Sequence, residues 1–201
     1  SIRTDGSSLF GKNHRYATFY SFGGMWKAKS EPFLQHVNWV NDLSLSVSYG
    51  TTGNAGLGSW YESLGLVGAG PKYNGLAGWA LAQVPNADLT WETVATLNVR
   101  LHTRLWDRLT MGLEFYDRTS SDLLMELPFS GTTGHASGMG NIAEMKNTGF
   151  DLEVELDLIH TRNVYWGVRA NVNYNKNKIT KLYQGLDELA FPDYSLKYQV
   201  G

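Results

Sequence analysis

Apolar and polar residues alternate strictly in the stretch DLEVELDLIH, residues 151–160, where an acid stands at every second position from Asp151 to Asp157. Side chains of a β-strand point alternately to two faces, so the four acids of such a strand share one face. The opposite face consists of Leu152, Val154, Leu156 and Leu158. The pattern predicts a strand with one acidic and one aliphatic face, and it leaves open which of the two meets water.

Five more segments alternate in the same way, although the first is less regular, and none follows the period of a helix. In the segment 91–105, Val94 is the one apolar residue on the polar face. Between the first two strands we expect a short helical turn, with Ser30 as its cap and Pro32 in its first turn. The predicted strands lie near residues 15–27, 42–50, 91–105, 109–118, 148–159 and 164–175.

The connections between these strands fall into two classes that alternate along the chain. Residues 106–108 and about 159–163 are tight turns. Residues 51–90 and 120–146 are long, rich in Gly, Ser and Thr, and unpatterned. A chain of this kind is expected to form hairpins whose short turns share one rim.

Side-chain parity fixes which residues face each other in the hairpins, because paired strands must bring like faces together. The three-residue loop of the first tight turn sets Arg100 opposite Glu114. Either close register of the second hairpin sets Arg169 opposite Glu153 or Glu155. We predict two cross-strand ion pairs on the polar face.

Alternation fits both a soluble sandwich and a membrane barrel, but three further features favour the barrel. The best strands run for about 11–15 residues, enough to cross a bilayer at a tilt. Short turns on one rim and long loops on the other are typical of bacterial barrels, as are aromatic girdles at both ends of the apolar faces. The aromatic residues near the long loops are Tyr49, Trp91, Phe115, Phe150 and Tyr174, and those near the short turns are Trp26, Trp106 and Trp166.

Six strands are fewer than the minimum of about eight in a closed membrane barrel, so we expect only part of one. In such a barrel the aliphatic face of residues 151–160 meets lipid and the acids meet a wet interior. The opposite register would place four carboxylates in hydrocarbon, which is prohibitive.

Composition narrows the remaining classes. The chain has 201 residues, of which 42% are hydrophobic, and this argues against disorder. A net charge of −2 provides no basic surface for nucleic acid. The absence of cysteine excludes disulfides and thiolate metal ligands, and no apolar run is long enough for a membrane helix. Because the first ten residues, SIRTDGSSLF, contain neither Met nor a signal-peptide core, we expect a processed or internal piece.

Several motifs follow one another along the chain: RTDGSSLFGKNHRY, VNDLSLSVSYGTTGN, PNADLTWETVATLNVRL, YDRTSSDLL, PFSGTTG, NIAEMKNTGFDLEVEL and VNYNKNKITKL. In this order and spacing they resemble barrel segments of SusC/RagA-family TonB-dependent transporters of the outer membrane. The resemblance covers about residues 3–183. The chain departs from the family where TFYSFGG replaces a usual Pro-Ser pair and where NAD replaces NPD.

This resemblance implies an all-β fold, an antiparallel transmembrane β-barrel segment with long extracellular loops and short periplasmic turns. The family barrel has about 22 strands around an N-terminal plug. Residues 1–201 then form a partial barrel domain, and the plug domain is not in this chain. The resemblance also implies import of an oligosaccharide or peptide across the outer membrane of a Gram-negative bacterium. Its expected partners are membrane lipid, a SusD-like surface lipoprotein over the extracellular mouth, and TonB acting through the plug.

No catalytic residue is carried over by the resemblance, so candidate contact residues come from their positions. Aromatic rings in the first long loop could stack on sugars or contact the lid protein, or they could pack the loop against itself and its neighbours. Basic residues on the predicted inner face could contact ligand or plug, or could pair with acids of neighbouring strands. The aromatic candidates are Trp60, Tyr61, Tyr73 and Trp79, and the basic candidates are Arg100, His102 and Arg104.

Other chemistry finds little support in the sequence. GLVGAG, residues 65–70, has no Walker lysine and no βαβ context. The five histidines lack metal-ligand spacing, and no nucleophile elbow is present. We therefore expect no cofactor, no metal and no enzymatic activity. The rival class is a soluble β-sandwich that binds carbohydrate, and a third possibility is a structural barrel that transports nothing.

Overall fold

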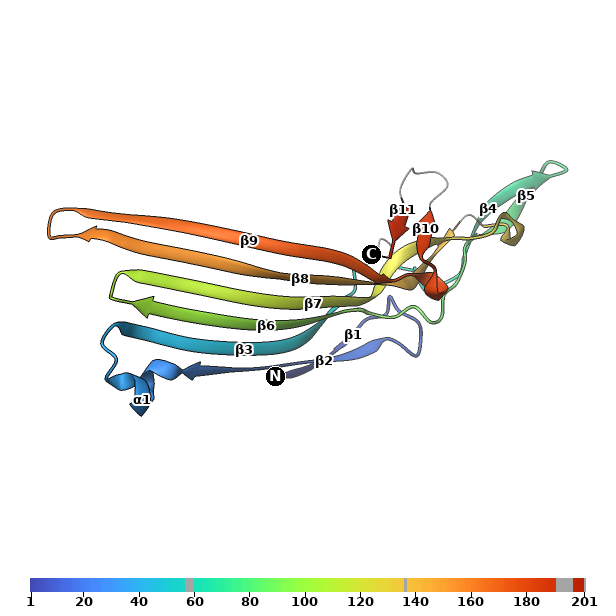
Figure 1. Cartoon of the computed structure of the whole chain (residues 1–201). Helices are drawn as coiled ribbons and strands as arrows, with labels where there is room; N and C mark the ends of the chain where they lie inside the picture. The colour runs from blue at the N-terminus through green and yellow to red at the C-terminus, as the bar shows by residue number, and fades with distance from the viewer. Residues whose placement is uncertain (57–59, 136, 191–196, 201) are drawn as a thin grey trace.

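The computed structural model describes residues 1–56, 60–135, 137–190 and 197–200; for residues 73, 184, 188–190, 197 and 198 it describes the backbone but not the side chain. Most of these residues form one open antiparallel sheet in the order β1-β2-β3-β6-β7-β8-β9, whose long strands lie side by side in Figure 1. The strands are β1 Ile2–Gly6, β2 Tyr16–Lys27, β3 Val40–Asn54, β6 Glu92–Leu105, β7 Leu109–Pro128, β8 Ser137–His160 and β9 Tyr165–Lys181.

Two small hairpins lie outside this sheet. One consists of β4 Leu66–Tyr73 and β5 Leu76–Gln83, and it projects beyond the main sheet in Figure 1. The other consists of β10 Glu188–Ala190 and β11 Lys197–Gln199. Both belong to the end of the molecule where the long connections lie, which we call the loop end. The opposite end, with the tight turns, is the turn end.

The turn end carries the only α-helix among the described residues, α1 Pro32–Gln35, which follows a 3₁₀ turn at Ala28–Ser30. Pro32 is the first helical residue, as predicted. The predicted cap is wrong, because Ser30 belongs to the 3₁₀ turn and Glu31 takes the cap position without a side-chain hydrogen bond. No helix in the described ranges is long and apolar enough to span a membrane.

The predicted pairing across both hairpins is confirmed. Arg100 faces Glu114 and Arg169 faces Glu155 across their strand pairs. The first loop has three residues, 106–108, whereas the second turn lies at residues 161–164, where Thr161 N–H donates to the Val164 carbonyl over 2.8 Å. β8 is therefore slightly longer at this end than the pattern predicts.

The long connections contain more structure than their lack of pattern predicts. β7 and β8 continue as paired strands well into residues 120–146, and β4–β5 lies within residues 51–90. Alternation fails in the extended part because the register shifts on either side of Leu123. Each shift exchanges the faces of the following residues, so no single period describes this segment.

The apolar face of the sheet is not covered by another layer. Val47, Leu97, Leu101, Val168 and Val172 all lie on this face, and 39–53% of their surface is exposed. A β-sandwich buries its apolar face against a second sheet, and none packs here among the described residues. The described sheet therefore does not have the two-layer arrangement of the rival sandwich prediction.

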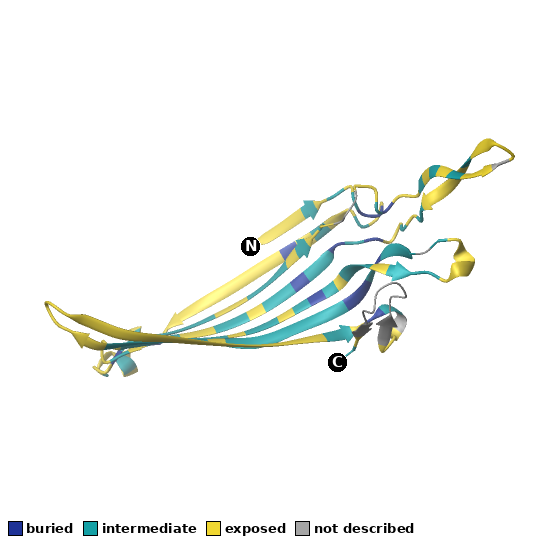
Figure 2. Cartoon of the chain, turned by 90° about the horizontal axis from the view of Figure 1, so that it is seen from above, coloured by how far each residue is buried: buried dark blue, intermediate teal, exposed yellow. Residues whose placement is uncertain are grey.

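Buried residues are few, and most lie toward the loop end of the sheet, as Figure 2 shows. One cluster consists of Phe10, Phe19, Leu89 and Trp91, and a second consists of Ile142, Ala143 and Leu182. Trp91 was predicted to belong to the outer aromatic row, and this is wrong. It lies just before β6, so strand alternation does not fix its direction, and its ring packs against Phe10 and Phe19 at 4.9 and 5.9 Å.

Candidate functional site

The polar face of the sheet carries a series of charged pairs between neighbouring strands. Arg100 Nε lies 3.3 Å from a Glu114 carboxylate oxygen, and Arg169 Nη2 donates to Glu155 over 2.9 Å. A second acid, Glu153, lies 4.0 Å from Arg169 Nε. These pairs follow directly from the strand register, because each joins residues that are opposite or diagonal on one face.

A hollow of about 420 Å³ opens in this polar face around Gly112. A Cβ at Gly112 would meet no atom within 4 Å, so the missing side chain leaves open space in the wall. His102 lies directly across the ladder from Gly112, with Glu153 on the other side. The hollow is lined by Met25, Ser44, Ser46, Arg100, His102, Thr110, Gly112, Glu153 and Glu155. This wall can offer donors and acceptors of both charges to a polar molecule.

The three predicted basic residues are not equally placed. Arg100 and His102 both line the hollow, and His102 Nε2 lies 3.9 Å from an Asp42 carboxylate oxygen. Arg104 lies nearer the tight turn, where its guanidinium donates to the Asp107 carbonyl over 3.2 Å. Among the described residues no group of three or more His, Asp and Glu side chains is arranged to hold a metal ion.

The aromatic candidates lie at the loop end on what we call the aromatic arm, the turn at residues 60–64 together with the β4–β5 hairpin. Trp60 and Trp79 are 79% and 78% exposed, so most of each ring faces solvent, and Tyr61 is 56% exposed. The side chain of Tyr73 lies outside the described part. The Gln83 side-chain amide joins the two parts of the arm by donating to the carbonyls of Tyr61 and Leu64.

The alternation of apolar and polar residues does not predict the β4–β5 hairpin, although the Asn-Gly dipeptide of its turn indicates one. Tyr73 pairs with Leu76 across Asn74 and Gly75, whose φ values are +48° and +78°. Two successive positive φ angles make a type I′ turn, and Asn-Gly is its preferred dipeptide. The seven candidate residues therefore form two separate groups, since the arm projects from the loop end while residues 100–104 approach the turn end (Figure 1).

The arm is attached to the sheet through a short segment that the sequence did not single out, residues 84–91. Asn141 on β8 clasps Thr90 from both sides: its Oδ1 accepts from the Thr90 N–H and its Nδ2 donates to the Thr90 carbonyl, each over 2.9 Å. Asn86 donates to the Met139 carbonyl, and Gly11 N–H donates to the Leu89 carbonyl. This segment connects the loop between β1 and β2 to β8.

An ion pair links β8 and β9 near the same end. Lys181 Nζ lies 2.9 Å from a Glu144 carboxylate oxygen, and the Thr180 hydroxyl donates to the other oxygen over 2.7 Å. The hydrogen bonds from Lys181 and Thr180 hold the pKa of Glu144 below its ordinary value, and the bond to Glu144 raises the pKa of Lys181. Both partners lie beyond the apolar part of the wall.

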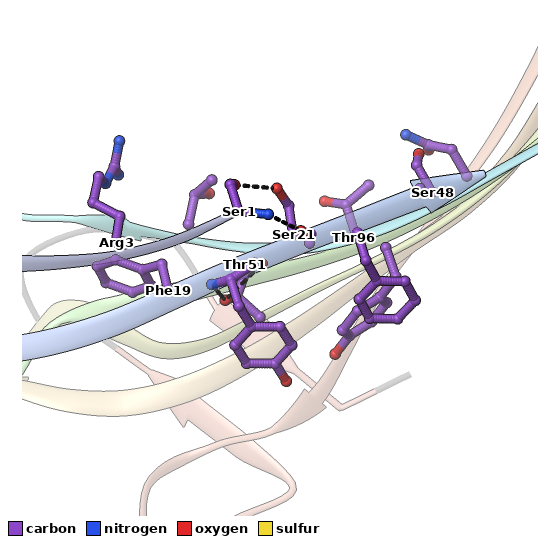
Figure 3. Close-up of a pocket in the computed structure, with 14 residues that line it drawn as sticks. Ser1, Arg3, Phe19, Ser21, Ser48, Thr51 and Thr96 are labelled. Atoms are coloured by element: carbon purple, nitrogen blue, oxygen red, sulfur yellow. Dashed lines mark hydrogen bonds between the residues drawn. The ribbon is translucent and has the colours of Figure 1, made fainter. Parts of the chain in front are cut away.

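Another hollow, of about 510 Å³, lies at the edge of the sheet where β1 begins beside β2. Figure 3 shows Ser1, Arg3 and Phe19 along it, and Ser1 is joined to Ser21 through both its amino group and its hydroxyl. An adjoining strand of a closed barrel would run along this edge. We therefore assign it no ligand.

Aromatic side chains form rows on the apolar face. Toward the loop end, Phe115, Phe150 and Tyr174 lie in one row across β7, β8 and β9, with ring centroids 6.1 and 5.8 Å apart. Phe22 and Tyr49 form another aromatic pair on β2 and β3 at 5.5 Å, separated from this row by β6, where Leu97 lies opposite Tyr49. The aliphatic residues lie between these rings and the turn end, where Trp39 stacks on Trp106 at 5.7 Å.

An open antiparallel wall, with a polar face, an uncovered aliphatic face and aromatic rows at both of its ends, is part of a large transmembrane β-barrel. The family profile described as "TonB dependent receptor-like, beta-barrel" matches residues 1–199. The chain belongs to this family.

Similar proteins support the same assignment. The TonB-dependent receptor P39 of Formosa agariphila is 34% identical over 183 residues, and SusC of Bacteroides thetaiotaomicron is 33% identical over 204 residues. These matches cover 90% and 93% of this chain, but only 18% and 19% of the relatives. The solved structure of the RagAB peptide transporter matches the whole chain with a TM-score of 0.87 and 36% identity, over 22% of its own chain. This chain thus spans about a fifth of the relatives it matches.

Proposed function

We propose that this chain forms part of the barrel wall of an active importer in the outer membrane of a Gram-negative bacterium. The importer takes an oligosaccharide or peptide into the periplasm, with a SusD-like lipoprotein at the extracellular mouth and TonB acting through a plug. The observation that carries the proposal is the two-sided wall. Its aliphatic face suits lipid, and its polar face suits a water-filled lumen that holds a plug and a passing ligand.

The aromatic arm is proposed as a contact for the lid lipoprotein or the ligand. Between Leu64 and Gln83 the only charged residue is Lys72. An isolated two-stranded hairpin is only marginally stable in water, so exposed rings such as Trp60 and Trp79 favour burial against a partner. Tyr61 and Tyr73 belong to the same proposed contact.

The inner wall is proposed as a contact for the plug or the passing ligand through Arg100, His102 and Arg104. Arg100 and His102 share the Gly112 hollow, and this supports a common role for them. Their partners Glu114 and Asp42 do not line the hollow, whereas the hydroxyls of Ser44, Ser46 and Thr110 do, so donors remain for another molecule. We propose neither a catalytic activity nor a cofactor, in agreement with the receptors and transporters that the chain resembles.

The first experiment tests transport with the protein at its full natural length. Cells that lack the gene should lose uptake of labelled peptides or oligosaccharides, and the restored gene should return it only when TonB is present. The class of labelled compound that is taken up identifies the substrate. Wild-type uptake in cells without TonB would contradict active import.

A second experiment tests the arm. Replacing both Trp60 and Trp79 by Ala should reduce co-purification of the lipoprotein at least about tenfold, because exposed aromatic residues dominate such contacts. Lys72→Ala in the same hairpin is the matched control and should leave co-purification unchanged. Equal recovery of lipoprotein with the double variant and with the control would assign the arm another role.

A further inference from the structure

The apolar face of the sheet, which is the outer face of the proposed barrel, carries basic instead of apolar residues just beyond the aromatic row at the loop end. On β9 the residue two positions past Tyr174 on this face is Lys176, followed by Lys178, and both are exposed. On β8 the corresponding residue is Lys146. We call these three lysines the basic rim.

The strand register places all three lysines on the outer face. Phe150 pairs with Tyr174, Thr148 with Lys176 and Lys146 with Lys178, without a register shift between them. Side chains two residues apart share a face, so the lysines follow the same face as the aromatic row. The rim is thus a direct continuation of the uncovered apolar face.

Few acidic side chains neutralise the positive charge of the basic rim. Lys146 and Lys178 are directly opposite each other, an arrangement that destabilises a sheet when the charges are alike. Asp117 pairs with Lys146 at 2.8 Å, but Lys176 and Lys178 form no ion pair within the described ranges. An anion bound between the strands would relieve this repulsion.

We infer that the basic rim binds the phosphate-bearing headgroup of a lipid in the outer leaflet. The inference rests on the membrane location in the proposed function. At about 3.4 Å per residue, Lys176 and Lys178 lie about 7 and 14 Å along the strand from Tyr174. A strand tilted by about 45° brings them about 5 and 10 Å above the aromatic row, at the depth of lipid headgroups.

The rim is confined to one sector of the wall. The residues beyond the aromatic row on the same face are Thr51 and Gly53 on β3 and Ala95 and Thr93 on β6, none of them basic. On β8, Thr148 stands beside Lys176 and adds a hydroxyl donor for a phosphate oxygen. A uniform attraction to anionic lipid would not need this grouping, so the rim fits one bound headgroup.

The test uses the full-length protein in detergent, titrated with lipid A that carries phosphate, with complexes counted by native mass spectrometry. Lys176→Gln and Lys178→Gln should each raise the Kd about fivefold, and the double variant about 25- to 30-fold. Lys72→Gln on the arm makes the same charge change away from the rim and should keep the wild-type Kd. Lipid A without phosphate should bind the wild type as weakly as phosphorylated lipid A binds the double variant.

Each other outcome has a defined meaning. A double variant with the wild-type Kd contradicts headgroup binding by the basic rim, as does equal binding of lipid A with and without phosphate. Competition by inorganic phosphate at the concentration of the lipid would assign the site to free phosphate instead. A wild-type protein that is monodisperse without detergent contradicts the membrane location and therefore both proposals. A folded, detergent-dependent wild type with an unaffected double variant contradicts the rim alone.

Discussion

The wall formed by β6–β9 and the loop end are stabilised in different ways. In the wall, regular backbone pairing positions every residue, and side chains such as Arg100 and Glu114 meet because they are opposite in the ladder. At the loop end, single side chains hold segments together: Trp91 packs in a buried cluster, and Asn141 forms two hydrogen bonds with the backbone of Thr90. The wall should therefore tolerate many substitutions within one face, whereas the loop end should depend on a few residues.

The largest effect is expected from Trp91→Ala at the loop end. Loss of its ring leaves a cavity beside Phe10 and Phe19 and removes the hydrogen bond from its indole to the Arg15 carbonyl. The free energy of unfolding should fall by about 3–5 kcal/mol, measured by urea unfolding in detergent. Trp79→Ala, at an exposed ring, is the control and should change it by less than about 0.5 kcal/mol. Equal effects of the two variants would remove the distinction between cluster and arm.

In the wall, the effect of a substitution on stability should depend mainly on whether the residue lies on the aliphatic or the polar face. Leu152→Arg places a cation on the aliphatic face and should cost about 2–4 kcal/mol in a bilayer. Asn171→Arg places the same residue on the polar face beside Glu153 and should be nearly neutral. Unfolding of both variants in lipid bilayers measures the difference, and a penalty at residue 171 as large as at residue 152 would argue against a lipid-facing aliphatic surface.

A smaller effect is expected where the loop end meets the wall. Asn141→Ala leaves the N–H and the carbonyl of Thr90 without their partners and should cost about 1–3 kcal/mol. Amide hydrogen exchange should increase across residues 84–91, while the paired part of β6 and β7 keeps its protection. Asn175→Ala, at an exposed position on β9, is the control and should leave exchange unchanged. Unchanged exchange in both variants would show that the clasp does not hold this segment.

The smallest effect concerns the ion pair between Glu144 and Lys181. The pKa of Glu144 is lowered in the folded protein, so its contribution is complete above its ordinary value of 4.5 and is lost as the pH falls through the lowered value. The pKa of Lys181 is raised, so its contribution is complete below its ordinary value of 10.5 and is lost above that range. Glu144→Gln should lower the melting temperature at neutral pH by no more than about 2 °C, and this difference should shrink as the pH falls below 4.5. A difference that persists at the lower pH would have another origin.

The sequence by itself determined the wall, because in a sheet with one face in lipid and the other in water the period of two is a direct physical requirement. It predicted the strands, the two faces and the pairs that Arg100 and Arg169 form. It did not predict the extended parts of β7 and β8, since register shifts near Leu123 exchange the faces there.

Only the tertiary structure decided the arrangement of the loop end and the grouping of the candidate residues. The sequence pattern predicts Trp91 in an aromatic girdle, whereas in the fold its ring packs against Phe10 and Phe19. His102 and Arg100 line one hollow because Gly112 on the next strand leaves space for it. Arg104 is on the same strand but does not line the hollow, and its guanidinium donates to the Asp107 carbonyl instead. Such contacts join residues far apart in the chain and depend on side-chain shape, and local alternation carries no information about them.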